Sequence, residues 1–208
     1  MDEGYSLDLG RIRAVYEETE PGWLEYYANR PVKGRDADAA YRRLNEMVIQ
    51  NLNVTNEAAE TERLSNLVMN RREEISSSIP LELYPDAAPV LSRLSFSGYT
   101  LALVSNAPSD TSKTVEELGL SRFIKHVVIS GIVGFSKPNP EIFRIALSRA
   151  SARAQETVHV GDVYASDVVG ARSAGIHAVL LDRYGTSREV GCDKIRTLTE
   201  LPSLLARV

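Results

Sequence analysis

Residue types suited to phosphate chemistry follow three short apolar runs of the chain. A hydroxyl and an amide, Ser105 and Asn106, come directly after the first run, and an ammonium, Lys137, lies in the loop beyond the second. Two carboxylates, Asp162 and Asp167, follow the third run. A phosphoryl group is held by hydroxyl, backbone N–H and cationic donors. Because Mg²⁺ prefers a few carboxylates completed by water and substrate phosphate, this set predicts a phosphate site with a magnesium ion.

Each of these motifs alone has an ordinary structural explanation. A Ser-Asn pair after a strand is commonly a turn, a Lys-Pro pair a solvated loop, and a Gly-Asp pair a turn with an N-cap. The site hypothesis depends on their joint position after successive runs, since ligands of open parallel sheets lie beyond the carboxyl ends of the strands. Two roles stay open for Asp167, as a second metal ligand or as the ion-pair partner of Lys137. His159, inside the third run, is expected to be a partnered core residue.

The apolar runs that must position these residues alternate with helical stretches. Short β-rich runs occur at 99–104, 127–129, 158–160 and 178–181. Helical stretches occur at 86–94, 111–118, 140–150 and 167–174. Continuous apolar strands that alternate with helices predict an α/β fold, with a parallel sheet covered by helices on both faces.

The first part of the chain, up to about Ile79, has helical periodicity instead. Apolar residues recur at three- and four-residue steps over 36–52 and 55–75. Two prolines punctuate the earlier stretch and indicate shorter helices around 12–19 and 22–28. A polar run closed by Pro80 marks the boundary, so the sequence predicts a helical domain at 11–79 and an α/β domain at 80–208.

Composition limits the classes of partner. The chain has 208 residues, 43% of them hydrophobic, and a formal net charge of -4, which gives no bulk attraction for nucleic acid or anionic membrane. Its single cysteine, Cys192, excludes an intrachain disulfide. The first residues lack a signal-peptide pattern, and the apolar runs are too short to span a bilayer. We therefore expect a cytoplasmic monomer or homodimer that binds a small phosphorylated substrate.

The ordered set of motifs resembles the haloacid dehalogenase-like (HAD) hydrolase superfamily, in its phosphatase type with a helical cap. Residues 103–106 resemble the second motif of that superfamily, residues 136–143 the third, and residues 161–167 the fourth. The match covers roughly 84–185, in the right order and with the right intervals. The resemblance implies a Rossmann-like parallel sheet with helices on both faces, plus an N-terminal α-helical cap.

The resemblance also implies roles for the candidate residues. Ser105 and Asn106 would bind the phosphoryl oxygens, and Lys137 would neutralise charge, so that Ser105 and Lys137 act in catalysis. Asp162 would bind Mg²⁺ and Asp167 would support the metal site. The reaction implied is hydrolysis of a phosphate monoester through an aspartyl-phosphate. The glycine before Asp162 is similar to that of the metal-dependent phosphatases rather than the dehalogenases, which use no metal.

The first motif of the superfamily has no counterpart at the start of the chain. That motif is an apolar strand ending in Asp-x-Asp-x-Thr, whose first Asp attacks phosphorus and whose second protonates the leaving group. Neither Asp2 nor Asp8 follows an apolar run or has an Asp two residues later. In the superfamily this strand lies mid-sheet, so we expect a gap between the strands that begin near Tyr99 and Thr157. A gene that extends upstream of Met1 is a simpler explanation than a rebuilt fold.

Three functions are compatible with these residues. The first is a magnesium-dependent phosphatase in shortened form, weakly active or inactive as given. The second is a pseudoenzyme that binds a phosphorylated ligand or a protein partner. The third is a haloacid dehalogenase, against which the Gly161-Asp162 pair argues. Upstream coding sequence would separate the first two, because an in-frame Asp-x-Asp-x-Thr there would restore the enzyme.

Overall fold

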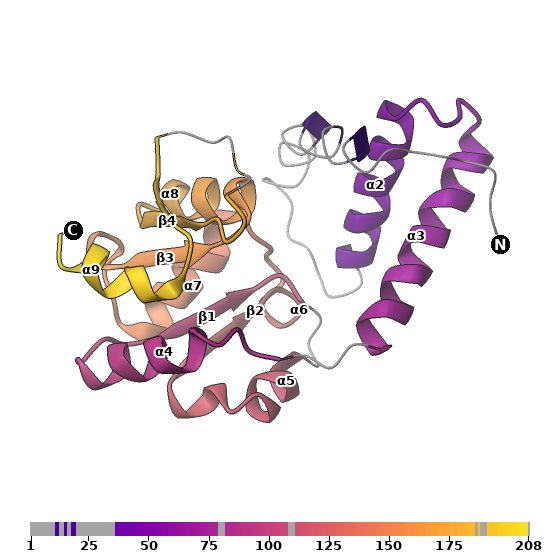
Figure 1. The fold of residues 1–208 in the computed structure, drawn as a ribbon. Helices are drawn as coiled ribbons and strands as arrows, with labels where there is room; N and C mark the ends of the chain where they lie inside the picture. Colours follow the sequence, from indigo (N-terminus) through magenta and orange to yellow (C-terminus); the bar gives the residue numbers. More distant parts are fainter. Residues whose placement is uncertain are drawn as a thin grey trace. The chain divides into compact units, whose positions relative to one another are not determined.

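The structure divides into two compact units, each described here by itself. It is a computed structural model that describes residues 11, 12, 15, 18, 19, 36–78, 82–107, 111–185, 187 and 191–207. One unit comprises Met1–Tyr27 and Arg35–Pro80, and the other comprises Ala28–Gly34 and Leu81–Val208 (Figure 1).

The first unit is built on two helices, α2 (Asp36–Asn51) and α3 (Ala58–Ser78), which pack against each other. Val15, Leu44 and Val48 form its buried apolar cluster. The helices predicted at 36–52 and 55–75 are confirmed, and the described residues of the 12–19 stretch are helical. The helix predicted at 22–28 lies outside the described residues.

Among the described residues of the second unit, five parallel strands form two sheets. Strand β1 (Ala102–Ser105) pairs with β2 (His126–Ile129), and β3 (Val158–Gly161), β4 (His177–Leu181) and β5 (Asp193–Ile195) pair in that order. The four apolar runs predicted as strands are confirmed. Strand β5 was not predicted, because Ile195 is its only buried residue.

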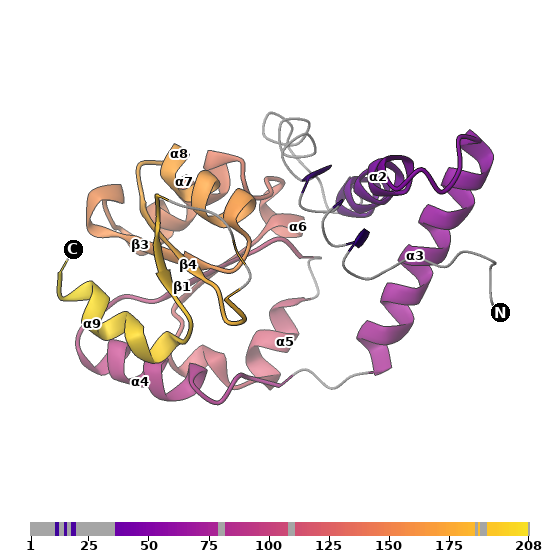
Figure 2. The same ribbon diagram turned by 45° about the horizontal axis from the view of Figure 1, so that its top comes forward.

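Helices cover both faces of this unit, as the sequence predicts (Figure 2). On one face, apolar residues of α7 (Pro140–Ala150) and α8 (Gly170–Ser173) pack with β2 and β4. On the other, α4 (Ala87–Phe96) and α9 (Leu201–Leu205) pack with β4 and β5. The remaining elements are α5 (Thr111–Glu117), α6 (Ser130–Val133), the 3-10 turns η1 (Leu120–Arg122), η2 (Ala154–Glu156) and η4 (Leu198–Glu200), and the π-helical turn η3 (Tyr164–Val169). The parallel α/β class is therefore confirmed.

The two sheets are not joined by strand pairing. Within the described residues, β1 pairs only with β2, and β3 pairs only with β4. The gap that the sequence predicts beside these two strands stays a prediction.

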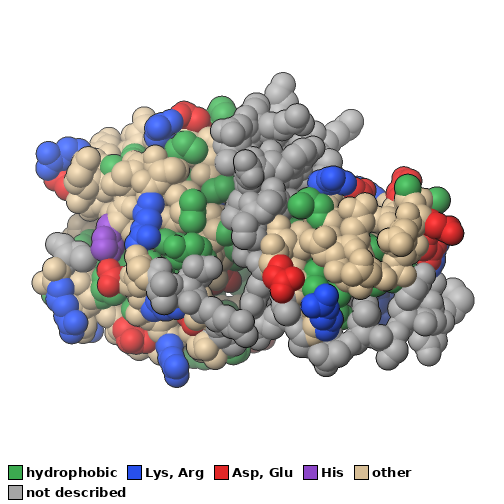
Figure 3. All heavy atoms as spheres, turned by 90° about the horizontal axis from the view of Figure 1, so that it is seen from above, with side chains coloured by type: hydrophobic (Ala, Val, Ile, Leu, Met, Phe, Trp, Pro, Cys, Tyr) green, Lys and Arg blue, Asp and Glu red, His purple; other side chains and the backbone are tan. Residues whose placement is uncertain are grey.

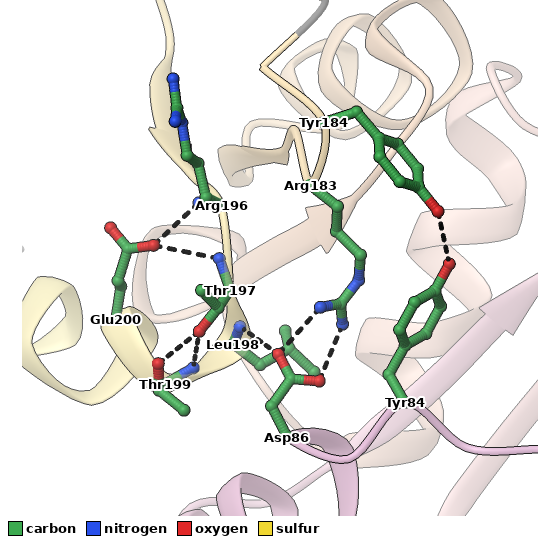
Figure 4. A network of polar contacts seen from close by, with 9 residues as sticks. All are labelled: Tyr84, Asp86, Arg183, Tyr184, Arg196, Thr197, Leu198, Thr199 and Glu200. Carbon is green, nitrogen blue, oxygen red and sulfur yellow. Dashed lines mark hydrogen bonds and ion pairs between the residues drawn. The ribbon is translucent and has the colours of Figure 1, made fainter.

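A polar network ties the start of α4 to the end of β4 (Figure 4). The Asp86 carboxylate accepts hydrogen bonds from both terminal nitrogens of Arg183, at 2.9 and 3.1 Å, and from the Leu198 N–H at 2.8 Å. The Arg183 guanidinium lies 4.0 Å from the centre of the Tyr84 ring, and the Tyr84 hydroxyl lies 3.3 Å from that of Tyr184. The hydrogen bond from Arg183 holds the pKa of Asp86 below its ordinary value. This network fixes the start of α4 against the end of β4.

The described surface carries mixed charge. On the face shown in Figure 3, Lys and Arg side chains are interspersed with Asp and Glu side chains. Among the described residues, no helix is both long and apolar enough to cross a membrane.

Candidate phosphate-binding site

Asn106, directly after β1, fixes the backbone of Lys137. Its Oδ1 accepts a hydrogen bond from the Lys137 N–H at 2.7 Å, and its Nδ2 donates to the Lys137 carbonyl at 2.8 Å. The Lys137–Pro138 peptide bond is cis. Since both ends of the Asn106 amide are engaged by the protein, its geometry favours positioning of Lys137 over the predicted contact with substrate.

A second clamp joins the segment after β1 to the start of α6. The hydroxyl of Ser130, which begins α6 directly after β2, accepts a hydrogen bond from the Ala107 N–H at 3.0 Å. Ser130 is fully buried. Sequence reasoning missed this residue, although its position matches that of Ser105, a serine at the end of an apolar run. The clamp holds the carboxyl ends of β1 and β2 in a fixed relation.

The ammonium of Lys137 forms an ion pair with Asp167. Its Nζ lies 2.6 Å from Asp167 Oδ1, and the two side chains are 13% and 2% exposed. The same oxygen lies 3.1 Å from Nε2 of His159, which donates in the tautomer that carries its proton there. The other oxygen accepts a hydrogen bond from the Val163 N–H at 3.0 Å. Of the two roles that the sequence leaves open for Asp167, the ion pair with Lys137 is the one present.

The Asp167 carboxylate is ionised at neutral pH. Burial raises its pKa, but the hydrogen bond from His159 and the charge of Lys137 outweigh burial and hold the pKa well below the ordinary value. His159 is itself held edge-on against the ring of Phe143, with ring centres 5.0 Å apart. Three donors occupy three of the about four lone-pair sites of the Asp167 carboxylate, so it keeps little capacity to bind a metal ion.

Gly161 makes the close approach of Asp167 possible. The π-helical turn η3 brings Asp167 back over the end of β3, with its N–H bonded to the Val163 carbonyl at 2.8 Å. A Cβ atom on Gly161 would lie closer than 3.0 Å to three atoms of the Asp167 side chain. A glycine is therefore required here by the carboxylate that holds Lys137.

Gly161→Ala is expected to lower the free energy of unfolding by about 3 kcal/mol. Overpacking costs about 1–3 kcal/mol, and displacement of Asp167 also weakens hydrogen bonds to charged groups, worth about 1.5–3 kcal/mol each. Urea unfolding followed by circular dichroism measures the loss. The control is Gly98→Ala, where φ is +89° and a new Cβ meets nothing within 4 Å. Gly98→Ala should lower the free energy of unfolding only by the strain of a left-handed conformation at a non-glycine residue, about 1–2 kcal/mol. Equal losses in the two variants would contradict the steric explanation.

Ser105 and Asp162 lie beside this network without joining it. Ser105 is the half-buried last residue of β1, and Asp162 is exposed and directly follows β3. Neither side chain is engaged in a hydrogen bond with another described residue. The structure thus brings Asn106, Lys137 and Asp167 together, and it leaves the Ser105 hydroxyl and the Asp162 carboxylate available to a ligand.

The described residues supply only part of a magnesium site. No group of three His, Cys, Asp or Glu side chains that could hold a metal ion is found among them. Asp162 provides one free carboxylate, whereas Asp167 is engaged by three donors. One carboxylate fits the ligand chemistry of Mg²⁺ but does not complete its shell.

The chain has one Asp-x-Asp pair, which the sequence reasoning did not consider. Asp36 and Asp38 have the spacing of the first HAD motif. They lie in the first turn of α2, in the other unit, and follow no described strand. Spacing alone therefore does not make them a counterpart of a motif that ends a strand.

The part of the chain that carries this network matches a protein-family model. A family model described as haloacid dehalogenase-like hydrolase matches residues 8–175. The phosphoserine phosphatase of Thermus thermophilus is 41% identical over 104 residues, which cover 49% of this chain and 41% of that protein. The glyceraldehyde 3-phosphate phosphatase of Pyrococcus furiosus is 33% identical over 126 residues, covering 58% and 52%. The chain spans about half the length of the curated relatives it matches.

Solved structures share the fold. A HAD phosphatase from Thermococcus onnurineus superimposes with a TM-score of 0.57 and 35% identity, over 59% of this chain and 58% of that one. A HAD-hydrolase from Bacillus subtilis bound to magnesium superimposes with a TM-score of 0.62 over 99% of this chain and 86% of that one. At 21% sequence identity, this likeness shows a shared fold and nothing about function. Because the family model covers most of the sequence, this chain belongs to the haloacid dehalogenase-like hydrolases.

Proposed function

We propose that this chain forms the α/β core and the helical cap of a magnesium-dependent phosphatase that acts on a small phosphorylated metabolite. The observation that carries the proposal is the Lys137 ammonium, held next to the ends of β1 and β3 by Asn106 and Asp167. The names of two matched relatives, phosphatases of phosphoserine and of glyceraldehyde 3-phosphate, support the same class of reaction.

The proposed roles follow from the donors that remain unused. Lys137 keeps two ammonium N–H donors beyond the one directed at Asp167, and Ser105 adds a hydroxyl at the end of β1. Both would bind phosphoryl oxygens. Asp162 would contribute one carboxylate to Mg²⁺, which when bound neutralises phosphate charge. Helices α2 and α3 would form the cap.

A pseudoenzyme that binds a phosphorylated ligand is the second candidate. The observation that favours it is that Asp162 is the only unengaged carboxylate among the predicted site residues. Phosphate binding is common to both candidates, whereas turnover belongs to the first.

Inorganic phosphate is expected to bind weakly at Lys137, and Lys137→Gln should reduce its affinity at least tenfold. An ammonium at a partly buried site supplies the charge-assisted hydrogen bonds that hold phosphate. Isothermal titration calorimetry measures the affinity. The control is Lys125→Gln, which removes the same charge from the exposed residue before β2, at the opposite end of that strand. Ser105→Ala should lower the affinity for phosphate about fivefold, because one net hydrogen bond is lost. The free energy of unfolding should not change. Equal affinity in the wild type and in both site variants would refute the proposal.

Mg²⁺ is expected to bind weakly and through Asp162. A single free carboxylate provides one of the ligands that the ion prefers, so a dissociation constant in the millimolar range is expected. Calorimetry with Mg²⁺ alone should show heat that Asp162→Ala abolishes. Asp193→Ala, which removes an exposed carboxylate from β5, is the matched control. Tight binding that survives Asp162→Ala would place the ion elsewhere.

A further inference from the structure

Two exposed tyrosines, Tyr84 and Tyr184, lie at the same end of the sheet as the candidate site. Tyr184 follows β4 and Asp162 follows β3, and these two strands are parallel neighbours. The carboxyl ends of parallel strands meet at one edge of a sheet, where ligands bind. The Tyr84 hydroxyl lies 3.3 Å from that of Tyr184, so both tyrosines belong to this edge (Figure 4).

The tyrosine pair lies within electrostatic reach of Asp162. The contact with the Tyr184 hydroxyl raises the pKa of Tyr84 above its ordinary value, and the negative charge of Asp162 adds to this rise. Because charges at an exposed site are largely screened beyond about 10 Å, the Tyr84 hydroxyl lies within about that distance of the carboxylate. One small molecule could therefore contact both the pair and the candidate phosphate site.

Backbone turns hold both tyrosines in place. The Tyr84 carbonyl accepts a hydrogen bond from the Ala87 N–H at 2.9 Å. Tyr184 lies in a turn that the Gly185 N–H closes on the Asp182 carbonyl at 3.1 Å. Since the main chain is already fixed at both positions, a ligand that binds the two rings would cost little backbone ordering.

The two rings are exposed rather than packed into a core. Tyr84 is 52% and Tyr184 is 79% exposed. The Arg183 guanidinium covers one face of the Tyr84 ring at 4.0 Å from its centre. The 3.3 Å between the hydroxyls exceeds the about 2.5–3.0 Å of an ordinary hydroxyl hydrogen bond, so a ligand oxygen can readily share this contact. Rigid rings with a polar end are suited to recognition.

The charges and donors around the pair favour a neutral hydroxyl group as its partner. Arg183 places a cation on the Tyr84 ring and disfavours a second one, whereas Asp162 disfavours an anion. When the two tyrosine hydroxyls bond to each other, one O–H donor and acceptor capacity on both oxygens remain. A ligand hydroxyl matches this set because it both donates and accepts, whereas an ammonium only donates and a carboxylate only accepts.

We infer that Tyr84 and Tyr184 form a specificity-determining subsite for a neutral polyhydroxylated chain, as in a polyol phosphate or an open-chain sugar phosphate. The inference rests on the proposed function, which supplies a phosphate site at Lys137 and Ser105. With the phosphate held there, a hydroxyl of the chain would bond the tyrosine hydroxyls, and its C–H groups would contact the rings.

The test compares three phosphate monoesters with the same six-carbon chain: sorbitol 6-phosphate, n-hexyl phosphate and 6-aminohexyl phosphate. Sorbitol 6-phosphate carries a hydroxyl on every carbon beyond the ester, so one of them can meet the pair whatever its distance from the phosphate. Isothermal titration calorimetry on the full chain, without Mg²⁺, measures the three affinities. Sorbitol 6-phosphate should bind about tenfold more tightly than either of the others, the effect of one to two net hydrogen bonds.

Removal of either tyrosine hydroxyl should abolish this preference selectively. Tyr84→Phe and Tyr184→Phe keep the rings and should each lower the affinity for sorbitol 6-phosphate about fivefold, because one net hydrogen bond is lost. Their affinities for hexyl phosphate and inorganic phosphate should not change, and neither should the free energy of unfolding. Tyr99→Phe is the matched control, since Tyr99 is exposed and precedes β1, at the opposite end of the sheet.

The outcomes separate the subsite from the phosphate site. Failure of sorbitol 6-phosphate to bind, binding no tighter than that of hexyl or 6-aminohexyl phosphate, or unchanged affinity in both Phe variants would overturn the inference. A loss in these variants that extends equally to inorganic phosphate would also overturn it. If sorbitol 6-phosphate binds through the tyrosine hydroxyls while inorganic phosphate does not bind, the subsite stands and the proposed phosphate site fails.

Discussion

Asp167→Asn is expected to lower the free energy of unfolding of the α/β unit by about 3–5 kcal/mol, the cost of breaking a buried ion pair from one side. The carboxylate accepts from Lys137, His159 and the Val163 N–H, and it is 2% exposed. An amide accepts on one atom only, so its NH₂ group must face one of these donors. The charge of Lys137, which is 13% exposed, would also lose its partner. Urea unfolding followed by circular dichroism measures the effect.

A double-mutant cycle separates the pair from the packing around it. Lys137→Met should cost about as much as Asp167→Asn, because it leaves the carboxylate without its cation. The cycle also needs the single variant Asp167→Leu. The double variant Lys137→Met/Asp167→Leu should lose less than the sum of the losses of Lys137→Met and Asp167→Leu, since replacement of both partners by apolar residues is often close to neutral. Glu156→Gln breaks the exposed pair with Arg153 and should cause no measurable change. Additive losses in the double variant would show that the two groups do not stabilise each other.

Most of the α/β fold could be predicted, because its strands are short apolar runs between helical stretches. Val179 shows why this signal is strong. It is fully buried against α4 and α9, while its neighbours Ala178 and Leu180 pack on the opposite face. Strand β5 lacks the signal, because it lies at the edge and leaves Asp193 and Lys194 exposed. An edge strand with one buried residue cannot be distinguished from a loop by apolar pattern alone.

The site could be predicted by residue type and only partly by role. The positions after successive apolar runs predict that Ser105, Lys137 and Asp162 gather at one end of the unit, and the structure joins Lys137 to Asn106 and Asp167. The side-chain directions that assign partners depend on backbone geometry that sequence does not specify. Asn106 bonds the backbone of Lys137, 31 residues away, which no local pattern encodes. Asp167 turns toward Lys137 because the π-helical turn η3 brings it over Gly161. A helical stretch was predicted from 167, and η3 begins at Tyr164.

Hydrolysis of p-nitrophenyl phosphate by the chain as given is expected to stay close to the uncatalysed rate. The two-step reaction of the family needs a carboxylate in line with phosphorus at the end of a strand. Among the described residues that follow strands, Asp162 is proposed for the metal and Asp167 is held by three donors. In subtilisin, loss of the covalent nucleophile lowers kcat on the order of 10⁶-fold. Ser105 and Lys137 would still bind phosphate, so binding without turnover is the expected combination.

Asp8 is the residue whose substitution tests this expectation. It lies in the sequence Tyr5-Ser6-Leu7-Asp8-Leu9-Gly10, where the family match begins, but it follows no apolar run. An attacking oxygen must be held within about 0.5 Å of its productive position, which a rigid buried strand achieves. The assay compares the chain with its Asp8→Asn and Asp162→Asn variants, with Mg²⁺ present, and Asp193→Asn serves as an exposed control. All four should give the same background rate. Robust turnover that both Asp8→Asn and Asp162→Asn abolish, and that Asp193→Asn preserves, would identify Asp8 as the nucleophile.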